Sequence, residues 1–257
     1  MKETVSSILI SVLAFTALSQ TTTNSIDAKA LLLKVQTSIM SAKTLRVSMR
    51  EEMFGVKTET RFMAKRYAKD CLSYRQEVHA IVSGKDVQPF IQIMNKNKLY
   101  SFPTGCGDVI VRMKFMEQGK AGLIANLFLS GGKIDLLKDD EKKCSIRYIC
   151  ASNEVADLSK AMADQYGATF NKDLVPAIFE YKVDKVSKTL SELIFYSERG
   201  RLVKRATFYD WKFNSEMSDS NFQMPSKYKM YTANTKKEAE RIQAELVKKA
   251  LARQHGK

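Results

Sequence analysis

The chain has 257 residues and a mass of 29.1 kDa, and its 42 Lys and Arg against 28 Asp and Glu give a formal net charge of +14. With only 4 Pro and 11 Gly, the composition excludes a collagen-like or low-complexity chain and predicts a globular protein with a sizeable core. Two His argue against a His-rich metal site. The positive charge favours an anionic partner, such as nucleic acid, lipid headgroups or an acidic protein.

Residues 1–19, MKETVSSILISVLAFTALS, have the build of a secretory signal peptide. Lys2 precedes a largely apolar stretch from Ile8 to Leu18, and Ala17 and Ser19 supply the small residues that cleavage needs. The stretch is short for a membrane span, and a retained N-terminal anchor is the alternative. We therefore expect a cleaved signal peptide and a periplasmic location, which argues against a nucleic-acid partner.

Four cysteines fit an oxidising compartment: Cys71, Cys106, Cys144 and Cys150. Four residues allow three disulfide connectivities, of which we favour Cys71–Cys106 and Cys144–Cys150, because each pair could join neighbouring strands or a hairpin. Zinc is the competing interpretation. The spacings contain no CxxC motif and no nearby His, so we expect no metal site.

The first elements in chain order are a helix and then a series of strands. The spacing of Ala28, Leu32, Val35 and Ile39 predicts an amphipathic helix over 24–40. From Thr44 the hydrophobic period changes to two, which predicts antiparallel strands joined by short turns. They fall at 44–53, 57–65, 72–82, 90–94 and 98–102.

The second half is less regular at first. Residues 115–129 predict a short helix or lid-like segment that ends at Gly131-Gly132, and 153–166 predict another helix that stops at Gly167. Strands resume after Pro176, at 179–183, 189–197 and 201–213. A polar helix over 235–253 begins with the capping box Thr235-Lys-Lys-Glu238.

These elements predict an α+β fold, in which a strongly curved antiparallel sheet is covered on its concave side by a few helices. The strands carry many aromatic residues on their alternating faces, and most of these side chains belong to the core in an ordinary domain. Because few helices are available to cover so long a sheet, we also expect a cavity for an apolar ligand.

Several stretches resemble the bacterial periplasmic lipoprotein carriers of the LolA type, a family within the LolA/LolB/LppX-type half-barrel superfamily. DAKALLLKVQTSIMSAKTLRVSMREEM is similar to the family's first helix and first strand, and RFMAKRYAKDCLSYR to its segment with a Lys-Arg-Pro turn. MNKNKLYSF resembles the family's D-G-K-x-x-W-x-Y hairpin. LSELIFYSERGRLVKRATFYDWKFNSEMSDSNFQMP resembles its closing strands and final F-x-x-P-type segment. Together the stretches cover most of residues 27–230.

The resemblance implies a half β-barrel under an α-helical lid, with acyl chains held between them. The helices around 26–40 and 115–129 would form the lid, and Arg66 would be its latch. Tyr67 replaces the family's proline, and a solvated strand-end charge is the alternative role for Arg66. The expected lipid-binding residues are Phe62, Tyr74, Phe90, Leu123, Leu127, Phe128, Phe179, Tyr181 and Phe195.

The expected organisation is a signal peptide at 1–19, a LolA-like lipid-binding domain at 20–230 and a basic helical tail at 231–257. Between Lys227 and Lys257 there are nine Lys or Arg and three Glu. Such a helix could lie on an anionic membrane surface, but its thin apolar face favours a solvated tail that packs weakly on the domain.

Sequence motifs for catalysis or nucleotide binding are missing. There is no G-x-G-x-x-G, no G-x-x-x-x-G-K-S/T and no G-x-S-x-G, and His79 and His255 are expected at the surface. We therefore predict a monomeric, non-enzymatic carrier of lipoprotein acyl chains or lipid, which needs no cofactor. The alternatives are an envelope interaction or stress-sensor module whose pocket is filled by its own side chains, and a hydrolase of an envelope polymer.

Overall fold

The structure is a computed structural model that describes residues 23–53, 56–68, 71–82, 85–86, 90–96, 98–102, 109–114, 131–166, 170–224 and 227–255. Its helices are α1 (Thr23–Ser41), α2 (Ser152–Tyr166), α3 (Lys236–His255), η3 (Lys172–Leu174) and η4 (Asp219–Phe222). Its strands are β1 (Thr44–Met53), β2 (Val56–Ala68), β3 (Cys71–Val82), β4 (Lys85–Asp86), β5 (Phe90–Asn95), β6 (Lys98–Phe102), β7 (Val109–Met113), β8 (Lys133–Asp139), β9 (Lys143–Ile149), β10 (Pro176–Asp184), β11 (Thr189–Ser197), β12 (Leu202–Phe213) and β13 (Lys229–Ala233).

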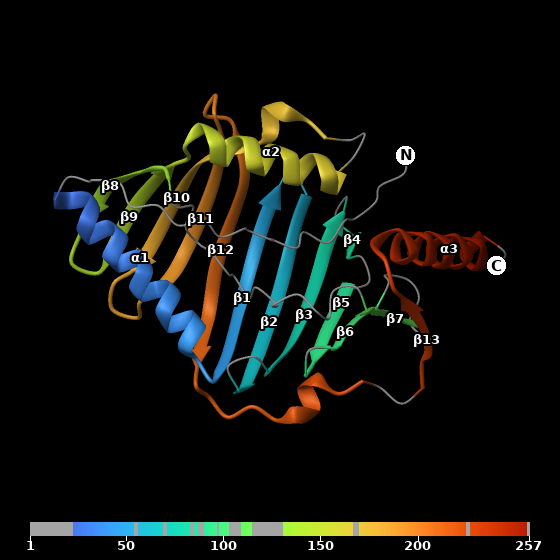
Figure 1. Cartoon of the computed structure of the whole chain (residues 1–257). Helices are drawn as coiled ribbons and strands as arrows, with labels where there is room; N and C mark the ends of the chain where they lie inside the picture. Colours follow the sequence, from blue (N-terminus) through green and yellow to red (C-terminus); the bar gives the residue numbers. More distant parts are fainter. Residues whose placement is uncertain are drawn as a thin grey trace.

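The strands of the described residues form one 13-stranded sheet with two wings (Figure 1). The sheet order is β13-β7-β6-β5-β3-β2-β1-β12-β11-β10-β9-β8, and β4 pairs with β3. In the outward-running wing, β1 to β7 follow the chain from the centre of the sheet toward one edge. In the inward-running wing, β8 to β12 follow the chain from the other edge back to the centre. The two wings meet where β1 pairs with β12. Because β8 and β13 do not pair with each other, the sheet stays open.

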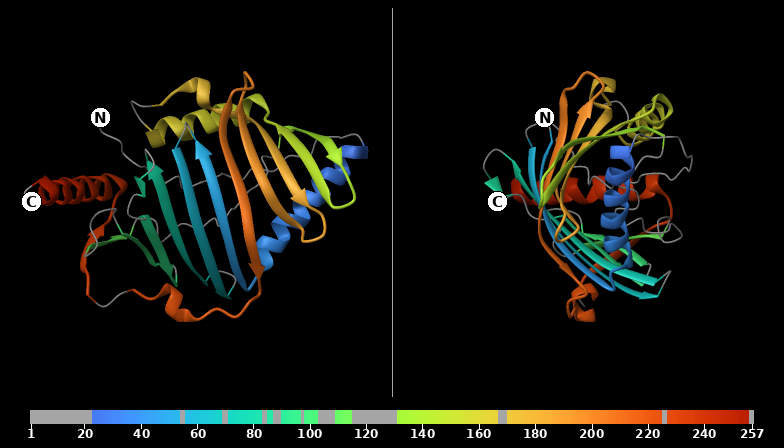
Figure 2. Two further views of the ribbon diagram at one scale, coloured as in Figure 1. Left: turned by 180° about the vertical axis from the view of Figure 1, so that it is seen from behind. Right: turned by 90° about the vertical axis from the view of Figure 1, so that its left-hand side faces the viewer.

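The sheet is strongly bent, and α1 lies inside the bend (Figure 2). We call the face toward α1 the concave face and the opposite face the convex face. The prediction of an α+β half-barrel with a curved, mainly antiparallel sheet and a C-terminal helix is therefore confirmed. The parallel pairing of β13 with β7 was not predicted.

The period-two patterns place apolar side chains on the concave face and charged side chains on the convex face. In β10, Phe179, Tyr181 and Val183 are buried, whereas Glu180 and Lys182 alternate with them. Glu180 pairs with Arg147 of β9 at 2.6 Å, and Lys182 pairs with Glu192 of β11. The convex face therefore carries a ladder of cross-strand ion pairs.

Helix α1 packs closely against the inward-running wing. Ala28, Leu32, Val35 and Ile39 are at most 4% exposed, as the predicted helical face requires. They join one core cluster with the concave residues of β8 to β11. Burying a side chain of the size of Leu, Val or Ile contributes about 2 kcal/mol, so separating α1 from the sheet would be strongly unfavourable.

Strands β7, β8 and β9 were missed by the sequence interpretation, as were the shorter β4 and β13. Strand β9 alternates cleanly, with Cys144, Ile146 and Tyr148 buried and the polar Ser145 and Arg147 between them, so its period-two signal was present in the sequence and was overlooked. The predicted segment 115–129 lies outside the described residues.

The predicted Cys144–Cys150 disulfide is wrong. Both residues are free thiols, and they stand at opposite ends of β9, where an extended strand separates them by roughly 20 Å at about 3.3 Å per residue. Cys71 is also a free thiol, and its predicted partner Cys106 lies outside the described residues.

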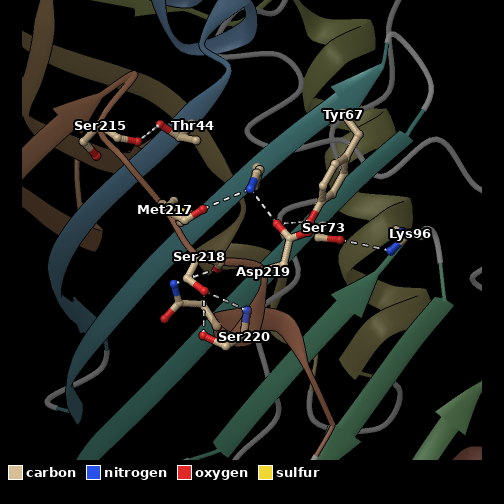
Figure 3. Close-up of polar contacts among 11 residues, drawn as sticks. Thr44, Tyr67, Ser73, Lys96, Ser215, Met217, Ser218, Asp219 and Ser220 are labelled. Atoms are coloured by element: carbon tan, nitrogen blue, oxygen red, sulfur yellow. Dashed lines mark hydrogen bonds and ion pairs between the residues drawn. The ribbon is translucent and has the colours of Figure 1, made fainter.

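A strap of residues 214–224 leaves β12 and runs past the ends of the strands in the outward-running wing (Figure 1), and Figure 3 shows polar contacts that hold it. Thr44 Oγ1 donates to the Ser215 carbonyl at 2.6 Å, and Tyr67 OH donates to Asp219 at 3.0 Å. Lys65 Nζ binds both the Met217 carbonyl and Asp219. The hydrogen bond from Lys65, followed by that from Tyr67, lowers the pKa of Asp219. The side chains of Met217 and Phe222, two residues of the strap, are buried, so the strap is part of the folded domain.

The C-terminal residues add to the sheet before they form α3. The boundary expected at residue 230 falls inside β13, which pairs with β7. Ala239, Ile242 and Leu246 of α3 pack on Val109 and Val111 in a second, smaller core cluster. One half of the capping box is present, since Glu238 N–H donates to Thr235 Oγ1 at 3.1 Å, while the Glu238 carboxylate accepts from the N–H of Asn234, the residue before Thr235.

Candidate functional site

The inward-running half of the concave face is filled by its own side chains. Tyr148, Tyr181, Ile146 and Leu190 are at most 1% exposed beneath α1. Phe179 is at the centre of an aromatic group, with its ring 5.0 Å from Phe195, 6.3 Å from Tyr148 and 6.5 Å from Tyr181. Three of the predicted lipid-binding residues, Phe179, Tyr181 and Phe195, thus belong to this packed core.

Next to this filled half, β12 presents a half-buried aromatic ladder made of Phe208, Trp211 and Phe213. The Trp211 ring is stacked on both neighbours, 5.8 Å from Phe208 and 5.6 Å from Phe213. Its Nε1–H donates to the Leu190 carbonyl at 2.8 Å, which fixes the plane of the indole. All three rings contact the main core cluster yet keep part of their surface accessible.

A bulge in β12 explains why these three residues share one face. Strict alternation would put Phe208 and Trp211 on opposite faces of the sheet, but the pairing with β1 shifts by one residue between Arg46 and Ser48. Asp210 occupies the extra position with φ +55°, the left-handed region that Asp tolerates better than most residues. The bulge therefore turns Trp211 and Phe213 to the concave side.

The outward-running half continues this wall with a mixture of apolar and polar side chains. Phe62 is half-buried, and its ring lies 5.7 Å from that of Tyr74. Tyr74 is buried, which raises its pKa to about 12, and its hydroxyl donates to Gln92 Oε1 at 3.2 Å. Phe90, on β5, is half-buried on the same face. The structure thus brings Phe62, Tyr74 and Phe90 onto adjoining strands, as a shared binding surface requires.

An ion pair between Lys204 of β12 and Glu51 of β1 lies on the concave face itself. The Lys204 side chain is 7% exposed and that of Glu51 is 12% exposed. Lys204 Nζ also lies 5.8 Å from the centre of the Phe195 ring. Each charge is compensated by the other, so the pair adds polarity to the wall without adding net charge.

Helix α2 crosses the sheet at the ends of the central strands (Figure 1) and is held firmly at its N-terminus. Glu154 accepts hydrogen bonds from Gly131 N–H, Ala151 N–H and Tyr148 OH, all within 2.9 Å. Burial and, second, the bond to Glu154 raise the pKa of Tyr148. The inner residues Val155, Leu158 and Met162 are only half-buried. Within the described residues, α2 is thus a looser cover than α1.

The remaining predicted residues have separate locations. Leu123, Leu127 and Phe128 lie outside the described residues. Arg66 is half-buried near the end of β2, and its backbone N–H donates to the Lys43 carbonyl at 2.8 Å. Its role as a latch remains a prediction.

The sequence interpretation did not select Phe208, Trp211 or Phe213 for the site. The signal that could have revealed them is the pair Tyr209-Asp210, where a turn-forming residue interrupts an aromatic strand. No cluster of three His, Cys, Asp or Glu suited to a metal ion occurs among the described residues. In the same part of the chain, no helix is both long enough and apolar enough to cross a membrane.

Comparison with known proteins gives structural similarity without sequence similarity. No family model and no curated protein match the sequence. An uncharacterised conserved protein from Thermus thermophilus aligns over 80% of this chain and 99% of its own, with 8% identity and a TM-score of 0.49.

Two further structures align over similar lengths. The Pseudomonas aeruginosa MucA/MucB complex matches 80% of this chain and 64% of its own, with 11% identity and a TM-score of 0.44. A LolA superfamily protein from Nitrosomonas europaea matches 77% of this chain and 97% of its own, with 13% identity and a TM-score of 0.31. All three alignments have TM-scores below 0.5, and none of the three proteins is more than 13% identical to this chain.

Proposed function

We propose that this protein is a non-enzymatic carrier of the bacterial envelope, which holds the acyl chains of a lipoprotein or lipid against its concave face for transfer between membranes. The observation that carries the proposal is the aromatic ladder Phe208–Trp211–Phe213. Its rings are stacked, fixed in orientation and half-accessible on the concave wall, beside the half-buried Phe62. An apolar surface of this kind fits an acyl chain.

A carrier must also release its cargo, so it can recover only part of the free energy gained by removing the cargo from water. Removing a sixteen-carbon chain from water contributes about 12 kcal/mol, at about 0.8 kcal/mol per methylene. A protein that recovered all of this energy would not release the chain to an acceptor. A wall that is part apolar and part polar, under the half-buried inner face of α2, recovers less and allows both loading and release.

Lipid binding is tested by extracting lipid from protein purified out of a periplasm, with native mass spectrometry of the intact complex. The expected result is an acyl lipid at near-unit stoichiometry, which would also support export. Phe62→Glu should weaken uptake of a fluorescent fatty acid roughly tenfold or more, because it places a charge where the chain lies. Its neighbour Met63 has the opposite orientation in β2, so Met63→Glu is the matched control.

A second function has one observation in its favour. The concave face under α1 is filled by side chains, which suits an envelope interaction or sensor module that needs no cargo. Protein that carries no lipid and takes up none in vitro would support this function and contradict the carrier. Equal uptake by wild type and Phe62→Glu would remove Phe62 from the site.

A further inference from the structure

The concave wall contains a row of uncharged polar side chains that an apolar binding surface does not require. Gln76 of β3 is paired with Gln92 of β5, and Gln92 with Ser101 of β6. Because paired residues of neighbouring antiparallel strands lie on the same face, the three side chains form one continuous row. Phe62, at one end of this row, is paired with Gln76, and Val111 is paired with Ser101 at the other.

Gln92 and Ser101 of this polar row are buried and Gln76 is half-buried, and part of the row's hydrogen-bonding capacity is unused. Gln92 is 3% exposed and Ser101 is 0% exposed. Within the described residues, Ser101 Oγ has no hydrogen-bond partner, and the same holds for Thr60 Oγ1, two residues before Phe62 in β2. A buried hydroxyl without a partner costs stability, so its retention on a wall otherwise suited to hydrocarbon points to a ligand that supplies the missing partner.

The chemistry of the row selects the kind of ligand group. Tyr74 OH donates to Gln92 Oε1, which orients the amide and leaves its NH2 group as the donor. Ser101 offers a hydroxyl donor beside it. Such donors match a carbonyl oxygen. The row and its two apolar ends carry no charge, and the concave cation described above, Lys204, is already paired with Glu51. A phosphate or a free carboxylate would therefore find no compensating charge here.

Building on the proposed carrier function, we propose that Gln92 and Ser101, with Gln76 beside them, bind the ester or amide carbonyls of a diacyl lipid, while its chains extend toward Phe62 and the aromatic ladder. The row then sets specificity, since it distinguishes an acyl ester or amide from a bare hydrocarbon or a free fatty acid. It also fixes the depth at which the linkage between the chains and the headgroup lies.

The test compares two fluorescent probes on the full-length protein: a pyrene-labelled diacylglycerol, which has ester carbonyls, and a pyrenyl alkane, which has none. Wild type should bind both, and the diacylglycerol more tightly. Gln92→Leu and Ser101→Ala should each weaken diacylglycerol binding roughly fivefold, as expected for one hydrogen bond between neutral groups, and leave alkane binding unchanged. Gln223→Leu, on the exposed part of the strap, is the matched control.

The outcomes separate the two proposals. If neither probe binds to wild type, the carrier function itself fails. If both bind and neither substitution changes the ratio of the two affinities, the carrier function stands and the role of the row is overturned. Unchanged alkane binding also shows that a variant is folded. If Gln92→Leu loses affinity for both probes, the substitution has disturbed the fold, and Ser101→Ala then decides whether the row binds the carbonyls. Competition by a diacylated lipopeptide against free diacylglycerol then shows whether the carbonyls come from a lipoprotein or from a membrane lipid.

Discussion

The indole of Trp211 donates a hydrogen bond to the carbonyl oxygen of Leu190, at 2.8 Å across the end of strand β11. This bond fixes the one tryptophan of the chain on the concave wall, between two stacked phenylalanine rings. The protein thus carries a built-in fluorescent reporter in the middle of the proposed site.

Acyl binding should therefore change the fluorescence of Trp211. A chain laid on the ladder excludes water from the exposed part of the indole, so we expect a shift of the emission to shorter wavelength that saturates with ligand. Titration with a saturated fatty acid, followed by emission scanning, measures it. A short, soluble fatty acid of the same charge serves as the control. Emission that stays constant while lipid is shown to bind would place the chain away from β12.

The bulge at Asp210 should be sensitive to the shape of the side chain. Asp210→Val should lower the free energy of unfolding by about 1–2 kcal/mol, because a β-branched residue fits poorly at φ +55°. The same substitution at the exposed neighbour Lys212 should have little effect. Urea denaturation, followed through Trp211, gives both values. Equal stability of the two variants would mean that the bulge is not strained by a side chain.

The ion pair between Glu51 and Lys204 predicts non-additive stability. Glu51→Leu or Lys204→Met alone should each cost about 3 kcal/mol, because each leaves a poorly solvated charge without its partner. The double variant Glu51→Leu with Lys204→Met should be more stable than either single variant. Thermal denaturation of all four proteins completes the cycle. Strict additivity would show that the two charges act independently.

The free thiols predict how the protein behaves at high pH. Burial first, and then the charge of Asp139, raises the pKa of Cys144 to about 11. Burial first, and then the charge of Glu154, raises the pKa of Cys150 to about 12. The folded protein keeps these protons after the unfolded chain, whose thiol pKa is near 9, has lost them. This stabilisation is fully present below pH 9 and is lost as the pH rises from 9 to about 12.

Alkylation at pH 8 measures the same property directly. Cys144 should react with iodoacetamide about a hundredfold more slowly in the native protein than in urea, because two units of pKa reduce the thiolate fraction by that factor. Peptide mass spectrometry distinguishes the sites. Equal rates in native and denatured protein, or a disulfide-linked peptide containing Cys144, would contradict the structure.

The periodic parts of the sequence were sufficient to predict α1 and a curved antiparallel sheet, whereas the half-barrel was expected from the family resemblance and the irregular parts were missed. Ala28, Leu32, Val35 and Ile39 predicted the buried face of α1, since four matched positions over three turns leave little ambiguity. The bulge at Asp210 was missed, because alternation assumes that every residue takes one place in the ladder. The polar row was also missed, since it appears only when the registers of three strands are known.

The pairing of β1 with β12 has a consequence for how the chain folds while it is being synthesised. Leu45 finds its partner Phe213 only when most of the chain has been made, so among the described strands the central seam is the pairing of longest range. Closing so long a loop is slow, and until then β1 has an unpaired edge with apolar side chains. An incompletely synthesised chain is therefore exposed to aggregation at β1. This edge has to stay protected until β12 has been made and can cover it.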